Sequence, residues 1–123
     1  MYYISVEADF DAAHYLREYK GKCESLHGHT FRVVVTLKAD HLDKTGIAYD
    51  FTLLKRQLNE VIAGFDHVCL NDIAPFDKIN PSSENIASVV YEKIEKILMG
   101  EPVRLAYVEV WESPTSHVLY KND

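Results

Sequence analysis

The sequence predicts an α+β protein, in which an antiparallel sheet of four strands carries two helices on one face. Two observations lead to this fold class. Apolar residues recur at every second position near both ends of the chain, which is typical of strands with one buried face. In the middle they recur at helical spacing, which indicates two amphipathic helices. The expected order is strand, strand, helix, helix, strand, strand, and residues 1–123 are predicted to form a single domain.

The first strand is expected over residues 2–10, where apolar and polar side chains alternate, and His14 lies just past its end. The second is expected from about residue 29 to residue 39. Its buried face should comprise Phe31, Val33, Val35 and Leu37, and its opposite face Arg32, Thr36 and Lys38. Residues 16–25 between the two strands are polar and predict a surface loop. Residues 43–46, Asp-Lys-Thr-Gly, predict a turn.

The first helix is expected over residues 51–65, with Asp50 as its N-cap. Its apolar positions are Phe51, Leu54, Leu58, Val61, Ile62 and Phe65. After a loop over residues 71–81, a second helix should begin at Ser82 or Ser83 and end before Gly100 and Pro102. Its apolar positions are Ile86, Val89, Val90, Ile94 and Ile97. The last two strands are expected over residues 103–112 and 117–120.

Composition narrows the classes of partner. The formal net charge of -6 argues against nucleic acid or an anionic membrane as the main partner. A small anionic substrate remains compatible with it, because Arg17, Lys20 and Lys22 form a local basic cluster. Two cysteines, Cys23 and Cys69, do not make a disulfide framework. No signal peptide and no apolar run of membrane-spanning length are visible, so we predict a cytoplasmic protein.

The most informative stretch is Cys23-Glu-Ser-Leu-His27-Gly-His29. In an extended segment residues i and i+2 point to the same side, so His27 and His29 can present two imidazoles to one ion. An antiparallel neighbouring strand would bring His14 alongside as a third ligand. A His-x-His pair alone is more often two ordinary histidines. Three imidazoles, however, suit Zn²⁺ and leave a fourth position open, which is the catalytic pattern.

Cys23 has three interpretations on its residues alone. It could be a fourth ligand that closes a structural zinc site, a reactive thiol beside the metal, or a small buried apolar residue. The polar neighbours Lys22, Glu24 and Ser25 argue against burial. Nearby cations and a metal would favour its thiolate form.

Two further acidic positions are candidates. Asp66 precedes His67, and a carboxylate can orient an imidazole for proton transfer. Sequence neighbours rarely face each other, however, and His67 is equally explained as a residue that the helix dipole favours. Glu112 follows Trp111 at a strand end, where a solvated charge is the default. His41 and His117 are predicted to lie on the surface.

Six short motifs together resemble the family of 6-pyruvoyltetrahydropterin synthase and 6-carboxytetrahydropterin synthase, over nearly the whole chain. They are Phe10-Asp-Ala-Ala-His14, Cys23-x-x-x-His27-Gly-His29, Tyr49-Asp-Phe51 with Leu54-Lys55, Asp66-His67 with Leu70-Asn71, Asn80-Pro-Ser-Ser-Glu84, and Trp111-Glu112. The resemblance implies the tunnelling fold. In that fold three subunits pair their sheets into a barrel and two rings stack into a homohexamer.

The resemblance also implies roles. His14, His27 and His29 resemble the zinc ligands, and Cys23 resembles the general base. Asp66 and His67 resemble the proton-relay pair that meets this base across a subunit interface. Glu112 resembles the residue that anchors the pterin ring, because one carboxylate can accept hydrogen bonds from a ring nitrogen and the adjacent amino group. No role is implied for Cys69.

Family members differ in their product. Three residues separate Cys23 from His27, as in members of the queuosine and deazapurine pathway. The implied reaction is conversion of 7,8-dihydroneopterin triphosphate to 6-carboxy-5,6,7,8-tetrahydropterin, with acetaldehyde and triphosphate released. Formation of 6-pyruvoyltetrahydropterin is the alternative within the enzyme class. Glu24 beside Cys23 leaves open a folate-type activity, because a further group has glutamate in place of the cysteine. The alternative outside the enzyme class is a non-catalytic domain with a structural Cys-His₃ zinc site.

Overall fold

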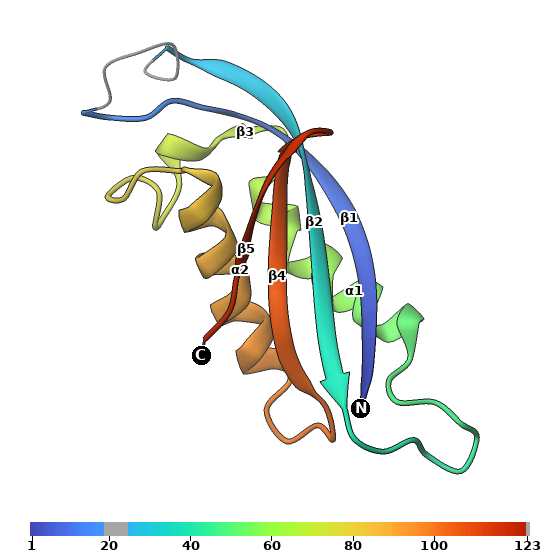
Figure 1. Cartoon of the computed structure of the whole chain (residues 1–123). Helices are drawn as coiled ribbons and strands as arrows, with labels where there is room; N and C mark the ends of the chain where they lie inside the picture. The colour runs from blue at the N-terminus through green and yellow to red at the C-terminus, as the bar shows by residue number, and fades with distance from the viewer. Residues whose placement is uncertain (19–24, 123) are drawn as a thin grey trace.

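The structure is a computed structural model of the protein, and it describes residues 1–18 and 25–122 (Figure 1). Its strands form one sheet in the order β3-β1-β2-β4-β5. They are β1 (Tyr2–His14), β2 (His27–Ala39), β3 (Val68–Cys69), β4 (Arg104–Ser113) and β5 (Ser116–Tyr120). The pairs β1–β2, β2–β4 and β4–β5 are antiparallel, whereas β3 is parallel to β1.

The α+β class is confirmed, but the expected sheet of four antiparallel strands is wrong, because the sheet is mixed and has five strands. The additional strand, β3, pairs only with Ala12 and Ala13. A strand of two residues cannot display a period of two, so the sequence gives no signal for it. The boundary expected for the first strand is also wrong. β1 continues through His14, which lies opposite His27 in the register with β2.

Both helices lie on the same face of the sheet (Figure 1). α1 (Phe51–Ile62) begins at the expected cap, where the Asp50 carboxylate accepts a hydrogen bond from the Thr52 N–H at 2.8 Å. It ends three residues before the expected boundary, because residues 63–65 form a separate 3₁₀ turn. α2 (Ser83–Ile97) is capped by Ser82, whose hydroxyl accepts from the Asn85 N–H at 3.1 Å. Neither helix is long and apolar enough to cross a membrane, within the described residues.

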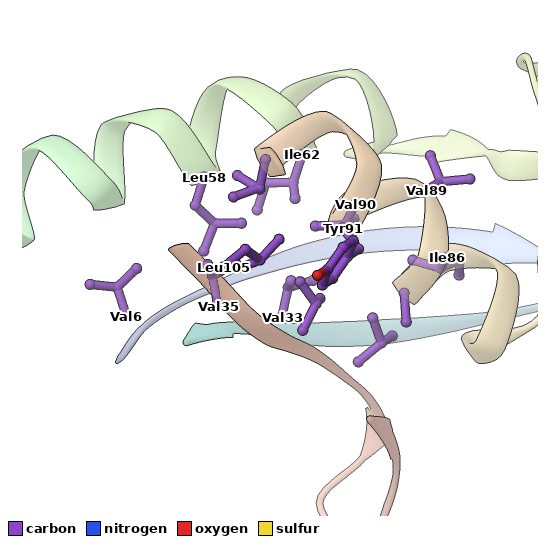
Figure 2. Packing of buried hydrophobic residues seen from close by; sticks show 14 of the residues in the cluster. Val6, Val33, Val35, Leu58, Ile62, Ile86, Val89, Val90, Tyr91 and Leu105 are labelled. Carbon is purple, nitrogen blue, oxygen red and sulfur yellow. The ribbon is translucent and has the colours of Figure 1, made fainter. Parts of the chain in front are cut away.

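The core fills the space between the sheet and the helices (Figure 2). The four predicted residues of β2, Phe31, Val33, Val35 and Leu37, are fully buried. Phe10 of β1 stacks on Phe31, with ring centroids 5.0 Å apart. Thr36, expected on the solvent face, is instead 1% exposed and its hydroxyl lies 2.7 Å from the Ser5 hydroxyl. Tyr2 is 48% exposed, so β1 is buried only farther along the strand.

The other face of the sheet carries polar and aromatic side chains, and no described helix covers it. There the Arg32 guanidinium lies 4.4 Å from the Trp111 ring and 2.9 Å from the Glu7 carboxylate. His117, predicted on the surface, is exposed and stacks on Trp111 at 3.9 Å. We call this side the open face. The opposite side, against α1 and α2, is the helix face.

Candidate metal centre

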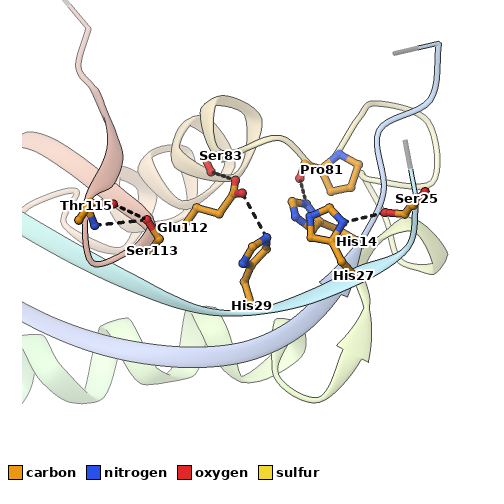
Figure 3. Close-up of polar contacts among 9 residues, drawn as sticks. All are labelled: His14, Ser25, His27, His29, Pro81, Ser83, Glu112, Ser113 and Thr115. Carbon is orange, nitrogen blue, oxygen red and sulfur yellow. Dashed lines mark hydrogen bonds and ion pairs between the residues drawn. The ribbon is translucent and has the colours of Figure 1, made fainter. Parts of the chain in front are cut away.

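Three histidines converge on the helix face at one end of the sheet (Figure 3). The antiparallel register sets His14 opposite His27 and Ala12 opposite His29, so the three side chains share a face. Ring centroids are 4.7 Å apart for His14 and His27, 4.6 Å for His27 and His29, and 5.3 Å for His14 and His29. The structure therefore brings together all three residues that the sequence predicts as ligands.

Backbone carbonyls orient two of the rings. The Nδ1–H of His14 donates to the Pro81 carbonyl at 2.7 Å, and the Nδ1–H of His27 donates to the Ser25 carbonyl at 2.7 Å. Each bond places the ring proton on Nδ1 and leaves the Nε2 lone pair available. Metal-binding histidines are commonly held in this way by a hydrogen bond from their second nitrogen.

His14 is the most enclosed of the three, with 2% of its surface exposed. Burial lowers the pKa of His14 below its ordinary value, and the adjacent His27 and His29 lower it further, against opposing contributions from the Pro81 carbonyl and Glu112. A lowered pKa keeps the imidazole neutral at pH 7, and the neutral form is the one that binds a metal.

Glu112 of β4 completes this cluster. Its Oε1 lies 3.2 Å from Nε2 of His29, and its Oε2 accepts a hydrogen bond from the Ser83 hydroxyl at 3.1 Å. The carboxylate is partly buried and turns toward the histidines (Figure 3). Glu112 is therefore not a freely solvated charge at a strand end.

The donor set fits a zinc ion. One ligand atom from each of His14, His27, His29 and Glu112 lies within 4.8 Å of the other three. The Nε2 atoms of His14 and His29 are buried and have no hydrogen-bond partner in the part of the chain that the structure describes. A buried nitrogen without a partner is costly, and a cation bound between these atoms would remove that cost. Imidazole nitrogens with a carboxylate oxygen are a donor set typical of Zn²⁺.

The loop that carries Pro81 is fixed by two asparagines. The Asn71 side-chain amide accepts from the Tyr15 N–H and donates to the Tyr15 carbonyl, both at 3.0 Å. Asn80 repeats the arrangement with Arg17, at 2.9 and 3.0 Å. Each amide thus pairs with the chain as a neighbouring strand would. The loop is held against the residues that follow His14.

Arg17 also ties this loop together through its side chain. Its guanidinium donates to the carbonyl oxygens of Phe76 at 2.8 Å, and of Asn71 and Ile79 at 3.3 Å. The sequence suggested Arg17 as part of a basic cluster for an anionic substrate. In the structure, however, the hydrogen bonds of its guanidinium go to carbonyl oxygens of the loop. The other two members of that cluster, Lys20 and Lys22, lie outside the described residues.

A second cluster forms at the edge of β1. Oδ2 of Asp66 lies 3.0 Å from Nδ1 of His67, and the left-handed backbone of His67, with φ at 59°, accompanies this contact between sequence neighbours. The Asp11 N–H donates to Oδ1 of Asp66 at 2.9 Å, and the His67 N–H donates to the Asp11 carbonyl at 2.6 Å. The bond from Asp11 and the contact with His67 hold the pKa of Asp66 below its ordinary value.

The two clusters belong to opposite faces. Asp11 and Thr30 alternate with the inward residues Ala12 and Phe31, so their side chains point to the open face. There the Thr30 hydroxyl donates to the Asp11 carboxylate at 2.5 Å. An open hollow of about 540 Å³ is lined by Asp11, Thr30, His67 and Cys69, and also by His29 of the metal cluster. Among the described residues, no hydrogen bond or ion pair joins Asp66 or His67 to the three histidines.

Cys23, the predicted base, lies outside the described residues. Ser83 and the Pro81 carbonyl are contacts that sequence reasoning missed, although both belong to the Asn80-Pro-Ser-Ser-Glu84 motif. Cys69 is half-buried in β3.

Comparison with known proteins identifies close relatives. Residues 3–123 match the family model described as 6-pyruvoyl tetrahydropterin synthase. The chain is 39% identical to a 6-carboxy-5,6,7,8-tetrahydropterin synthase of Synechocystis sp., covering 98% of this chain and 93% of the relative. It is 38% identical to a dihydroneopterin monophosphate aldolase of Pyrococcus furiosus, covering 89% and 88%. The structure of Caenorhabditis elegans 6-pyruvoyl tetrahydropterin synthase matches with a TM-score of 0.86 at 30% identity, covering 100% and 98%.

Proposed function

The chain belongs to the 6-pyruvoyl tetrahydropterin synthase family, and we propose that it is a zinc-dependent lyase that forms 6-carboxy-5,6,7,8-tetrahydropterin from 7,8-dihydroneopterin triphosphate. The observation that supports this most is the cluster of His14, His27 and His29, in which two buried nitrogens make no hydrogen bond to any described residue. Similarity to a relative named for this product, together with the short spacing from Cys23 to His27, favours the carboxy-forming reaction. We further propose that the product enters queuosine or deazapurine synthesis.

The atom balance of this reaction defines what the site must do. Triphosphate leaves with a proton, the dihydropterin ring gains two hydrogens and the side chain is oxidised in exchange. One water is then consumed as the carbon–carbon bond breaks, which yields the carboxylate and acetaldehyde. No external oxidant or reductant is required. The protein has to move protons on and off the side-chain carbons.

The histidine cluster would hold the metal. Zinc bound there would act as a Lewis acid on the side-chain hydroxyls and stabilise the oxyanion that forms when a neighbouring carbon loses its proton. His14 and His27 present Nε2 because their Nδ1 atoms are engaged by backbone carbonyls. The buried position of His14 limits its freedom to rotate away.

Proton transfer is assigned to Cys23 as the base and to His67 with Asp66 as its partner. Asp66 accepts a hydrogen bond from the Asp11 backbone and faces the His67 ring, so it can hold that ring in one orientation. Because this pair lies on the open face, we propose that it serves the metal centre of a neighbouring subunit. Glu112 would bind the ring N–H and amino group of the pterin.

A closed homohexamer follows from this assignment. β3 pairs with only two residues of β1, so most of that edge has no strand beside it among the described residues. Unpaired strand edges favour association with another chain, and closure into a barrel removes them. We propose that three sheets join edge to edge, that two such rings stack, and that the active sites lie between subunits.

Product analysis tests the reaction. The purified protein is incubated with 7,8-dihydroneopterin triphosphate and the pterin product is identified by mass spectrometry. We expect 6-carboxytetrahydropterin with equimolar acetaldehyde. 6-Pyruvoyltetrahydropterin without acetaldehyde would overturn the carboxy assignment. No product from the zinc-loaded protein would favour the structural Cys-His₃ alternative.

A second candidate is cleavage of dihydroneopterin monophosphate, which the similarity to the Pyrococcus furiosus aldolase favours. Glu24 beside Cys23 offers a carboxylate as an alternative base. The same assay with the monophosphate separates the two activities. Cys23→Ala should abolish the triphosphate reaction and retain zinc, whereas Glu24→Gln should affect only an aldolase reaction.

A further inference from the structure

We propose that in the absence of substrate Glu112 is the fourth ligand of the metal held by His14, His27 and His29, and that pterin binding draws this carboxylate away. The release of Glu112 by the pterin rests on the proposed function, in which Glu112 anchors the pterin. The coordination of the resting metal by Glu112 concerns only this protein and its metal. Together they describe a site that is closed at rest and opens when the substrate ring arrives.

The first argument is the contact between Glu112 and His29. Their Oε1 and Nε2 atoms form a close contact at 3.2 Å, and among the described residues Nε2 makes no other polar contact. Zinc bonds of 2.0–2.1 Å in a tetrahedron separate neighbouring ligand atoms by about 3.3 Å. The observed distance therefore fits two ligands that share one ion.

The second argument is how β4 delivers the side chain. Trp111 lies opposite His117 and Ser113 lies opposite Ser116, so Glu112 is the extra residue of a β-bulge. The ladder with β2 ends at Trp111. Bulges beside functional sites often redirect a side chain, and here one points toward the histidines (Figure 3).

The third argument is the role of Ser83. Its hydroxyl donates to Oε2 of Glu112 at 3.1 Å, and its side chain is buried at the start of α2. One carboxylate oxygen is therefore fixed by the protein while the other faces the histidines. This favours coordination through Oε1 alone. A single metal–oxygen bond can be exchanged by rotating the carboxylate, without displacing the backbone.

The two roles of Glu112 compete with each other. A carboxylate oxygen that shares a lone pair with the metal is a weaker hydrogen-bond acceptor, so the pterin ring and the metal compete for Oε1. Ring binding would release the fourth position at the moment when the substrate hydroxyls need it. Glu112 would also shield the metal from small anions until then.

Cobalt substitution tests the resting state, because the visible spectrum of protein-bound Co²⁺ reports its coordination. Wild-type protein loaded with Co²⁺ should show no spectral change with azide, since no position is open. Glu112→Gln should acquire an azide response and lose zinc affinity at least about tenfold in a chelator competition. Glu109→Gln, on the open face of the same strand, is the matched control and should behave as wild type. Glu112→Asp, which keeps a shorter carboxylate, should fall between them.

Two results would overturn the resting-state proposal. One is an azide response in the wild type as large as in Glu112→Gln. The other is a thiolate charge-transfer band that disappears in Cys23→Ala, which would make Cys23 the fourth ligand. Circular dichroism shows whether each variant is folded. If Glu112→Gln does not fold, the comparison of Glu112→Asp with the wild type decides the test.

The exchange is tested by adding a pterin that lacks the phosphorylated side chain. This ring should confer an azide response on the wild-type cobalt protein and leave Glu112→Gln unchanged. No response would overturn the exchange. All of these spectra are independent of turnover. Failure of the lyase assay would therefore leave them interpretable, and their failure would leave the lyase assignment standing.

Discussion

The Nδ1–H of His14 donates to the carbonyl oxygen of Pro81 at 2.7 Å, across 67 positions of sequence. This bond links a strand residue that could bind a metal to a loop that contains no predicted ligand. The distance between His14 Nδ1 and the Pro81 oxygen depends on where the loop lies. The loop is positioned by Asn71, Asn80 and Arg17. Residues far from the metal should therefore control its binding.

Asn80→Ala should weaken zinc binding without removing a ligand. The change deletes two hydrogen bonds to the backbone of Arg17, and each contributes about 1 kcal/mol to stability. With the Pro81 carbonyl less well fixed, zinc affinity should fall roughly 10–100-fold. Chelator competition measures the affinity. Asn59→Ala, at an exposed position of α1, is the control and should keep wild-type affinity.

Replacing any one of His14, His27 and His29 by alanine should lower zinc content and turnover together, because the remaining donors cannot hold the ion as tightly. The loss of affinity should exceed the roughly 10–100-fold typical of a supporting contact. Elemental analysis after dialysis measures zinc content. His41→Ala, an exposed histidine outside the cluster, should retain full zinc. Full occupancy in all three variants would contradict the metal assignment.

Asp66→Asn should lower turnover yet leave zinc content unchanged, because the pair with His67 lies on the face opposite the metal centre. The amide keeps the shape of the side chain but removes the charge that would stabilise a protonated imidazole. We expect a loss of roughly 10²–10⁴-fold, the usual contribution of a positioned acid–base group. Zinc loss in this variant would indicate that the two clusters are coupled within one chain.

The same residue predicts a pH dependence of stability. The folded state lowers the pKa of Asp66, so its carboxylate stabilises the fold above its ordinary pKa of about 4 and loses this effect as pH falls through the lowered value. Wild type should therefore exceed Asp66→Asn in stability near pH 6, and the difference should shrink below about pH 4. Urea midpoints followed by the fluorescence of Trp111 measure it. Asp72→Asn, at an exposed position outside the cluster, is the comparison.

Mixing two inactive variants tests shared sites. Cys23→Ala and His67→Ala each lack one half of the proposed proton path. After subunit exchange, some interfaces should combine an intact Cys23 with an intact His67, and partial activity should return. Exchange is verified by mass spectrometry of labelled subunits. A monomer by light scattering, or verified exchange without rescue, would contradict the proposed assembly.

Local patterns predicted what depends on local periodicity. The alternation in β2 identified Phe31 and Val35 as core, and both are fully buried. The same parity brought His27 and His29 to one side of the strand. These features follow from the geometry of a single extended segment. No distant residue has to be known to derive them.

The features that the sequence did not reveal depend on distant partners. β3 exists because Val68 and Cys69 meet Ala12 and Ala13, and two residues carry no period. Thr36 is buried although its position in the alternation is outward. The Pro81 carbonyl is a backbone atom, which no side-chain pattern can identify. Taken alone, Glu112 had a solvated charge as its default, and only the family resemblance marked it as a site residue, because its contact with His29 requires the sheet and α2 to be in place.

His14 belongs to the cluster on the helix face and His67 to a separate cluster with Asp11 and Asp66, and this has a consequence for stoichiometry. If neighbouring copies combine their clusters, a closed ring gives every copy one complete centre. An open row leaves an unmatched cluster at each end. Dilution that opens rings would then lower turnover per copy while every copy stays folded. The rate would rise more steeply than linearly with protein concentration, which would make cellular abundance a regulator of flux.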